Sequence, residues 1–312
     1  MTTIKNYLSL VKFSHTIFAM PFAMIGFFLA IRIPNSPSYS QYNLNDSIRW
    51  GKPFENISWG FLLIKFVLVI ICMISARSAA MAFNRWLDKS FDAKNPRTAI
   101  REIPAGIISA NSALMFVLVN CLVFIVATWF INSLCFYLSP VALFVILFYS
   151  YTKRFTPLCH LVLGLGLSLA PIGAYLAVTG SFAILPILFS LTVLFWVSGF
   201  DIIYALQDIE FDRSQKLFSI PAVLGKEKAL KMSEVLHLIS ALLVVTAGVI
   251  IGSGWLYWIG VFIFISLLIY QHSIVKPNDL SRVNIAFMTA NGIASVVFAI
   301  FVIADLFINK IY

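Results

Sequence analysis

Nine long apolar segments, separated by polar connections, constrain the fold of this chain more than any other feature. Most of them approach the ~20 residues that a helix needs to cross the hydrocarbon core of a bilayer. In lipid the backbone must satisfy its own hydrogen bonds, so segments of this kind are expected to be helices. The segments cover residues 14–33, 57–83, 112–131, 134–151, 160–178, 182–200, 232–251, 255–270 and 283–307.

The composition excludes several other classes of protein. Apolar residues make up 61% of the chain and charged residues only 11%, against about 25% charged residues in an ordinary soluble domain. The net charge of +9 does not indicate nucleic-acid binding, because the charges occupy a few loops between membrane-length segments. A large barrel would need short alternating segments, which the sequence lacks. The chain is therefore predicted to be an all-α polytopic membrane protein.

The distribution of basic residues predicts the orientation. If all nine segments cross, 17 of the 22 Lys and Arg residues fall on the side of the N-terminus. The positive-inside rule places that side in the cytoplasm and the C-terminus outside. Two long charged loops, residues 84–111 and 201–231, then face the cytoplasm, and the chemistry is expected there.

Each of these loops begins with polar side chains at intervals of four residues. The first row is Asn84, Asp88 and Asp92, and the second is Tyr204, Asp208 and Asp212. A four-residue spacing brings side chains to one face of a helix, so each row is expected to continue its span. The rows lie 120 residues apart, and an Ile-Pro-Ala sequence follows each of them. Residues 1–312 are thus predicted to form one domain with two internally similar parts, whose motifs are residues 84–106 and 204–225.

Paired acidic rows favour a metal site. Like charges four residues apart destabilise a helix by a few tenths of a kcal/mol, and the cost rises where the helix end is partly desolvated. Mg²⁺ takes carboxylate oxygens, keeps some waters and commonly binds substrate phosphate as well. Two facing rows are therefore expected to hold Mg²⁺ around a diphosphate, with Lys and Arg on the remaining oxygens. The alternative is that the acids are solvated charges at two helix ends, and the matching copies argue against it.

Basic side chains near the rows are candidates for binding substrate. Lys153 lies one turn after Tyr149 at the end of the fourth segment, and Lys12 precedes the first. Both also fit ordinary positive-inside composition. Arg77 lies two turns before Arg85 and nearer the bilayer interior, where a charge is costly and often functional. Its alternative role is to extend toward the cytoplasmic surface.

With these features the sequence resembles the UbiA superfamily of intramembrane prenyltransferases. The resemblance rests on the span count, the two rows, the Asn95-Pro96-Arg97-Thr98 sequence, the 149–154 segment and a first helix that begins with Lys12 to Thr16. It implies a bundle of nine helices around a central cavity capped by two cytoplasmic loops. It also implies Mg²⁺-dependent transfer of a prenyl chain from a prenyl diphosphate to a lipophilic acceptor.

The resemblance assigns roles to residues at matching positions. Four acids would be catalytic through the metal: Asp88, Asp92, Asp208 and Asp212. With Asn84 they would hold the Mg²⁺-diphosphate, while Arg97 and Lys153 contact the diphosphate, assisted by Lys12 and Tyr204. The candidates for an acceptor carboxylate are Arg77, Arg85 and Arg101. One departure concerns the acceptor, because many hydroxybenzoate enzymes carry an acid where this chain has Arg85.

The leading hypothesis is a polyprenyl transfer to an aromatic acid of the 4-hydroxybenzoate type in ubiquinone or menaquinone biosynthesis, in a bacterial inner membrane. A hydroxynaphthoate acceptor for menaquinone is the nearest alternative, and haem, ether-lipid or chlorophyll prenylation is less favoured. The expected partners are the prenyl diphosphate, the aromatic acid and the lipid bilayer, with no nucleic acid and no obligate protein partner. A secondary transporter is the alternative of another class. Against it, ten of the 13 acids fall on the cytoplasmic side, near helix ends, rather than at mid-membrane.

Overall fold

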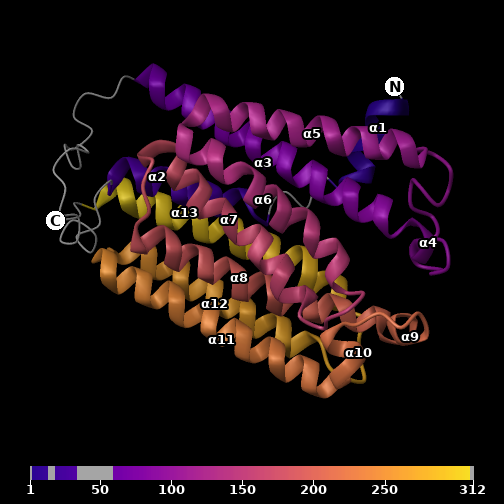
Figure 1. Ribbon diagram of the computed structural model, residues 1–312. Helices are drawn as coiled ribbons and strands as arrows, with labels where there is room; N and C mark the ends of the chain where they lie inside the picture. Colours follow the sequence, from indigo (N-terminus) through magenta and orange to yellow (C-terminus); the bar gives the residue numbers. More distant parts are fainter. Residues whose placement is uncertain (1, 13–17, 34–58, 310–312) are drawn as a thin grey trace.

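The computed structural model describes residues 2–12, 18–33 and 59–309. Nearly all of these residues are helical, and the long helices run side by side, up and down one bundle (Figure 1). The long helices are α3 (Trp59–Leu87), α5 (Ala110–Ile131), α6 (Ser133–Thr152), α7 (Cys159–Thr179), α8 (Ile184–Ala205), α11 (Lys226–Ile251), α12 (Trp255–Ile274) and α13 (Asn291–Ile308). The shorter ones are α1 (Thr2–Leu10), α2 (Met20–Arg32), α4 (Lys89–Asp92), η2 (Leu206–Asp208), α9 (Ile209–Ser214), α10 (Ile220–Leu224) and η3 (Ile285–Ala290).

The expected all-α membrane architecture is confirmed in the described part of the chain. Eight helices there are long and apolar enough to cross a membrane, and they correspond to the second to ninth expected spans. The protein is therefore an integral membrane protein. Large apolar side chains on the outside of the bundle fit contact with lipid, such as Leu122, Trp129 and Phe130 of α5.

The first expected span is described only in part. Residues 13–17 and the connection over residues 34–58 lie outside the described residues. The described helix α2 has 13 residues, which corresponds to a length of about 20 Å. Pro21 stands in its first turn, because proline has no N–H to donate and fits the start of a helix better than its interior. Within the described residues, the helix of the first expected span thus begins next to the proline, at Met20.

The core of the bundle is built around α8, which is the most buried of the eight spans and packs against both α7 and α11. Trp196 is fully buried there, with its ring centroid 5.3 Å from that of Phe22 and 5.9 Å from that of Phe264. Aromatic pairs at such distances add to the stabilisation that comes from apolar burial. This packing connects α2, α8 and α12 and leaves the charged ends of the helices at the surface.

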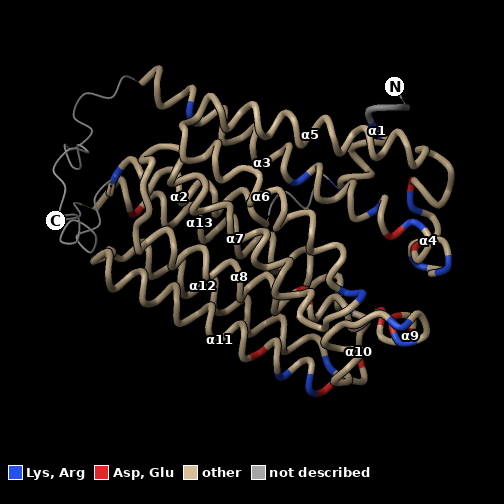
Figure 2. Tube along the Cα trace, in the orientation of Figure 1, with Lys and Arg blue, Asp and Glu red and all other residues tan. Residues whose placement is uncertain are grey.

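Charged side chains gather at the end of the bundle that carries α1, α4, α9 and α10 (Figure 2). The connections from α3 to α5, from α6 to α7, from α8 to α11 and from α12 to η3 all lie at that end (Figure 1). The two long charged loops of the sequence are therefore neighbours in space, as expected for a shared site.

The last span begins with a π-helical turn, η3, rather than with a regular α-helix. The buried Asn291 holds this turn: its amide donates to the carbonyl of Ala286 at 3.0 Å, and its oxygen accepts from Trp196 Nε1 at 2.9 Å and Gln271 Nε2 at 2.8 Å. Insertions of this kind are frequent at functional sites. The turn carries Phe287, whose ring lies at the charged end of the bundle against Tyr204.

At the opposite end, Asp305 of α13 caps the N-terminus of α12. Its carboxylate accepts hydrogen bonds from the backbone N–H groups of Gly254, at 2.9 Å, and Tyr257, at 3.3 Å. Gly254 has no side chain to serve as its own cap, and the Asn309 amide occupies the space that a Cβ would take. A neighbouring helix thus supplies the oxygen that the first turn of α12 needs.

Asp305→Ala should destabilise the purified protein in detergent by about 2 kcal/mol, because two buried backbone donors would lose their acceptor. The measurement is the thermal unfolding midpoint, with Asp279→Ala as the control, since Asp279 is an exposed acid in the loop after α12. Equal midpoints for the two variants would show that the cap contributes nothing.

Candidate active site

The charged end of the bundle contains a cavity of about 290 Å³ between the two loops. Every site residue predicted from the sequence lines it. These residues are Lys12, Arg77, Asn84, Arg85, Asp88, Asp92, Arg97, Arg101, Lys153, Tyr204, Asp208 and Asp212. Side chains from α3, from the ends of α1, α6 and α8 and from both loops therefore meet around one space.

The backbone brings the two rows to the cavity in similar ways, but each row is broken rather than carried on one straight helix. Asp88 follows the end of α3 with φ −91° and ψ 7°, and Asp208 precedes α9 with φ −108° and ψ 6°. These angles lie in the sparsely populated region between helix and strand. The N–H of Asp92 still donates to the carbonyl of Asp88 at 2.8 Å, so the four-residue spacing keeps the row on one side of the chain.

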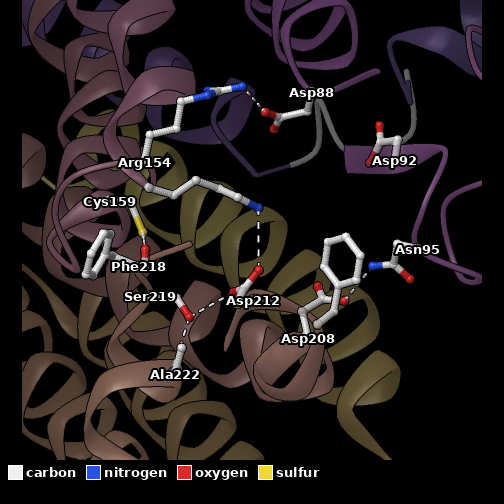
Figure 3. Close-up of polar contacts among 12 residues, drawn as sticks. Asp88, Asp92, Asn95, Arg154, Cys159, Asp208, Asp212, Phe218, Ser219 and Ala222 are labelled. Carbon is white, nitrogen blue, oxygen red and sulfur yellow. Dashed lines mark hydrogen bonds and ion pairs between the residues drawn. The ribbon is translucent and has the colours of Figure 1, made fainter. Parts of the chain in front are cut away.

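The rows lie on opposite sides of the cavity, with Asp88 and Asp92 on one side and Asp208 and Asp212 on the other (Figure 3). Each of the four acids is paired with a basic side chain. The pairs are Asp88 with Arg154 at 2.8 Å, Asp92 with Arg101 at 2.8 Å, Asp208 with Arg97, and Asp212 with Lys153 at 3.8 Å. Because three of the pairs are hydrogen-bonded, the carboxylates and their cations hold each other in position.

Arg97 joins the first loop to the second. Its Nε donates to Asp208 Oδ1 at 3.2 Å, a second guanidinium nitrogen donates to the other carboxylate oxygen, and Nη1 donates to Tyr204 Oη at 2.9 Å. Asn95 Nδ2 also lies 3.4 Å from Asp208 Oδ1 (Figure 3). The first loop thus contributes an amide and a guanidinium to Asp208 of the second.

Asp212 has a carboxylate oxygen that is available to a ligand. Its Oδ2 accepts from Ser219 Oγ at 2.9 Å, whereas its buried Oδ1 has no hydrogen-bond partner among the described residues and lies 3.8 Å from Lys153 Nζ. An unsatisfied buried carboxylate oxygen is costly unless a cation or a donor meets it. This atom therefore fits a bound metal ion.

Burial and neighbouring charges perturb two groups of the first loop. Burial raises the pKa of Asp88 above its ordinary value, although Lys153 and Arg154 oppose this effect. Burial lowers the pKa of Arg97, but the Asp208 carboxylate and Tyr204 raise it by more, so it lies above its ordinary value. Arg97 is thus held firmly in its charged form, while Asp88 binds protons more readily than an exposed aspartate.

The three candidates for an acceptor carboxylate differ in their surroundings. Arg85 is buried and donates to Glu102 at 3.0 Å, and Arg101 donates to both oxygens of Asp92. Arg77 lies deeper along α3, and its buried Nε has no hydrogen-bond partner in the described part of the chain. Of the three, Arg77 is the one with a buried guanidinium nitrogen that has no hydrogen-bond partner among the described residues.

A second cavity, of about 410 Å³, adjoins the first and lies among α3, α5, α6 and α7. The two cavities share Arg77, Met81, Tyr149, Leu163 and Leu167. Apart from these shared positions the lining is mostly alanine, valine, leucine, isoleucine and phenylalanine. A polar chamber at the membrane surface thus continues into an apolar one within the bundle.

Comparison with known proteins decides the family. Residues 54–293 match the model of the UbiA prenyltransferase family. The chain belongs to this family. Two relatives called 4-hydroxybenzoate octaprenyltransferase are each 30% identical to it. That of Tolumonas auensis aligns over 76% of this chain and 82% of its own, and that of Nitrosomonas europaea over 79% and 83%.

Solved structures show the same fold for this UbiA-family protein. The apo structure of a UbiA homolog from Aeropyrum pernix K1 is 27% identical, with a TM-score of 0.73 over 93% of this chain and 96% of the homolog. A UbiA homolog from Archaeoglobus fulgidus, bound to DMAPP and Mg²⁺, is 18% identical, with a TM-score of 0.72 over 97% of this chain. The protein is therefore a prenyltransferase rather than a secondary transporter.

Several polar residues of this UbiA-family site were not singled out from the sequence. Arg154 follows Lys153 directly and was grouped with it, although it pairs with the other row. Asn95 belongs to the Asn-Pro-Arg-Thr sequence, and Ser219 precedes the second Ile-Pro-Ala sequence. Proximity to a motif was the signal for all three, but only the folded loops show which acid each one contacts.

Proposed function

We propose that this prenyltransferase moves a polyprenyl chain from a prenyl diphosphate to an aromatic acid of the 4-hydroxybenzoate type, with Mg²⁺, in quinone biosynthesis. The observation that carries the proposal is the pairing of two acidic rows across one polar cavity that continues into an apolar one. The names of the two relatives support the acceptor class. The homolog bound to DMAPP and Mg²⁺ supports the donor and the metal.

The residues that would hold Mg²⁺ are the four acids of the rows and Asn84. Their oxygens are the ligands that Mg²⁺ prefers, and Asp212 Oδ1 has no hydrogen-bond partner among the described residues. Within the described residues, no three acids, histidines or cysteines converge on one point. Each ion would therefore take one or two oxygens from the protein, and the diphosphate and water would complete its shell. When bound, Mg²⁺ would neutralise the charge that grows on the departing diphosphate.

The basic residues around the cavity would bind the diphosphate oxygens. Arg97 and Lys153 are the main candidates, with Lys12 and the hydroxyl of Tyr204 as further donors. In the structure the first two are paired with Asp208 and Asp212. If Mg²⁺ and the diphosphate bind together, the two acids would turn to the metal and the two basic side chains to the phosphate oxygens. Each buried charge would then keep a partner of opposite sign.

Aromatic rings lie where the prenyl chain would be ionised. The rings of Phe18, Phe200 and Phe287 have centroids 5.4–5.5 Å apart, and Tyr204 stacks on Phe287 at 4.2 Å. All four line the polar cavity next to the second acidic row. Their electron-rich faces would stabilise an allylic cation that forms as the C–O bond breaks, and the apolar cavity would hold the rest of the chain.

The acceptor would lie between the ionised prenyl carbon and Arg77. A carboxylate on the aromatic ring would meet the Nε–H of Arg77, which has no partner in the part of the chain that the structure describes. A buried guanidinium gains most from an anionic partner there. Arg85 and Arg101 would act through Glu102 and Asp92 rather than on the acceptor directly. The loops that carry the site would face the cytoplasm in a bacterial inner membrane, as the basic residues predict.

Membranes that contain the protein should transfer the chain of a radiolabelled prenyl diphosphate to an aromatic acid when Mg²⁺ is present. The transfer should stop when Mg²⁺ is chelated. The assay offers 4-hydroxybenzoate and a dihydroxynaphthoate side by side, because Arg85 leaves the naphthoate as an alternative acceptor. Product from 4-hydroxybenzoate supports the proposal, and product from the naphthoate alone moves the function to menaquinone. No product from either acid would contradict an aromatic acceptor.

A further inference from the structure

A second pair of polar side chains in the cavity wall lies outside the two acidic rows. His160, in the first turn of α7, and Asp201, near the end of α8, both line the cavity. The distance from His160 Nδ1 to Asp201 Oδ2 is 2.7 Å. The histidine side chain is 3% exposed and the aspartate side chain 23% exposed, so the histidine is enclosed while the carboxylate reaches the space that substrate would occupy.

The hydrogen bonds of His160 determine where its proton lies. The backbone N–H of Ile220 donates to His160 Nε2 at 3.3 Å, so Nε2 carries a lone pair and no proton. The ring proton is then on Nδ1 and is donated to Asp201. The four acids of the rows face Arg or Lys, whereas the described partner of Asp201 is an imidazole whose Nε2 accepts a hydrogen bond from the backbone.

The second loop supplies this contact and also reaches the metal row. Ser219 donates to Asp212, and its neighbour Ile220 donates to His160. The N–H of Phe218 donates to the carbonyl of Lys153 at 2.7 Å. Residues 218–220 therefore contact the imidazole and also complete the polar wall of the cavity.

Asp201 lies beside the place that the proposed function gives to the acceptor. Asp201 precedes Tyr204 by three residues in α8, and Arg77 precedes Asn84 by seven in α3. Both therefore lie on the membrane side of the first member of their row, by about 5 Å and about 10 Å along a helix. Arg77, Tyr149 and Asp201 all line the polar cavity. A guanidinium and a carboxylate thus flank the same part of the cavity, below the diphosphate rows.

We propose that Asp201, oriented by His160, accepts the proton that the aromatic acceptor loses during prenylation. This inference rests on the proposed function. A ring carbon of the acceptor forms a bond to C1 of the prenyl chain, while the C1–O bond breaks and its electron pair leaves with the diphosphate. The acceptor must then release one proton, and it passes to the Asp201 carboxylate and later to water. His160 is a positioning residue, because it touches Asp201 and not the substrate.

Asp201→Asn should lower kcat for transfer to the aromatic acid by about 100-fold, the usual contribution of a positioned base. It should leave the KM for the prenyl diphosphate within a factor of about 3, because the metal and diphosphate residues are intact. Mg²⁺-dependent release of diphosphate without any acceptor should persist for the same reason. Glu210→Gln is the matched control, since Glu210 is an exposed acid of α9 outside the cavity.

Two variants of the histidine separate positioning from folding. In His160→Asn the amide nitrogen can replace Nδ1 as the donor to Asp201, whereas in His160→Gln the amide group can replace only Nε2. His160→Asn should therefore keep kcat within about 10-fold of the unaltered protein, and His160→Gln should fall to the level of Asp201→Asn. Thermal midpoints of both variants are measured alongside.

The inference is overturned if Asp201→Asn transfers at the unaltered rate, which would make diphosphate or water the proton acceptor. It is also overturned if Asp201→Asn loses diphosphate release in parallel with transfer, which would make Asp201 part of the diphosphate site. A protein that transfers to neither aromatic acid overturns the proposed function as well. The two failures can be told apart by the unaltered protein. If it is active and only the variants behave unexpectedly, the role of Asp201 is wrong. If it is inactive with both acids, the proposed function is wrong.

Discussion

Replacing Asp88 or Asp208 by alanine should abolish prenyl transfer, with a fall of at least ~10³-fold in kcat/KM, since the metal contributes several kcal/mol to stabilisation of the leaving group. Asp88 belongs to the first row and Asp208 to the second. Because both rows are needed to hold the metal, the intact row cannot compensate for the altered one. The variants would also leave Arg154 or Arg97 without its carboxylate partner. The measurement is the Mg²⁺-dependent transfer assay in membranes with equal amounts of each protein.

Glu210→Gln provides the control for removing an acid near the second row, because Glu210 is exposed and does not line the cavity. It should transfer at the unaltered rate. The metal-site account fails if Asp88→Ala and Asp208→Ala keep full activity, or if the control variant loses as much activity as they do.

The second large effect is expected for Arg77→Gln. The change should raise the KM for the aromatic acid by about 100-fold, because a buried carboxylate would lose its charged partner. The KM for the prenyl diphosphate should stay close to that of the unaltered protein, since Arg77 lies about two turns below the row of Asn84, Asp88 and Asp92. Steady-state kinetics with each substrate varied in turn measures both constants.

Arg282→Gln is the matched control for Arg77→Gln, because Arg282 is an exposed arginine in the loop before η3. A rise in the KM for prenyl diphosphate alone would move Arg77 to the diphosphate site. Unchanged constants for both substrates would leave the acceptor carboxylate without an assigned partner.

The spacing of the apolar segments was enough to predict the architecture, and the spacing of the acids was enough to predict that they lie together. Long apolar segments have few alternatives to membrane helices, and eight such helices are present in the described residues. The four-residue intervals of the acids placed them near one another, and all of them line one cavity. These features were predictable because each depends on short stretches of sequence.

Features that depend on contacts between distant residues were not predictable. Arg97 and Asp208 are 111 residues apart, so no local pattern indicates that they pair. The break at Asp88 was missed because a regular spacing of acids suggests a continuous helix, whereas the backbone turns there. The π-helical turn of η3 depends on Trp196 and Gln271, which meet Asn291 only in the folded bundle.

The central claim is that the two rows together bind one Mg²⁺-diphosphate group. Binding of a non-reacting thiolo analogue of the prenyl diphosphate to the purified protein, titrated with and without Mg²⁺, tests it most directly. The account predicts tight binding only with Mg²⁺, lost in both Asp88→Ala and Asp208→Ala and retained in Glu210→Gln. Mg²⁺-dependent binding of unaltered strength in either alanine variant would contradict it.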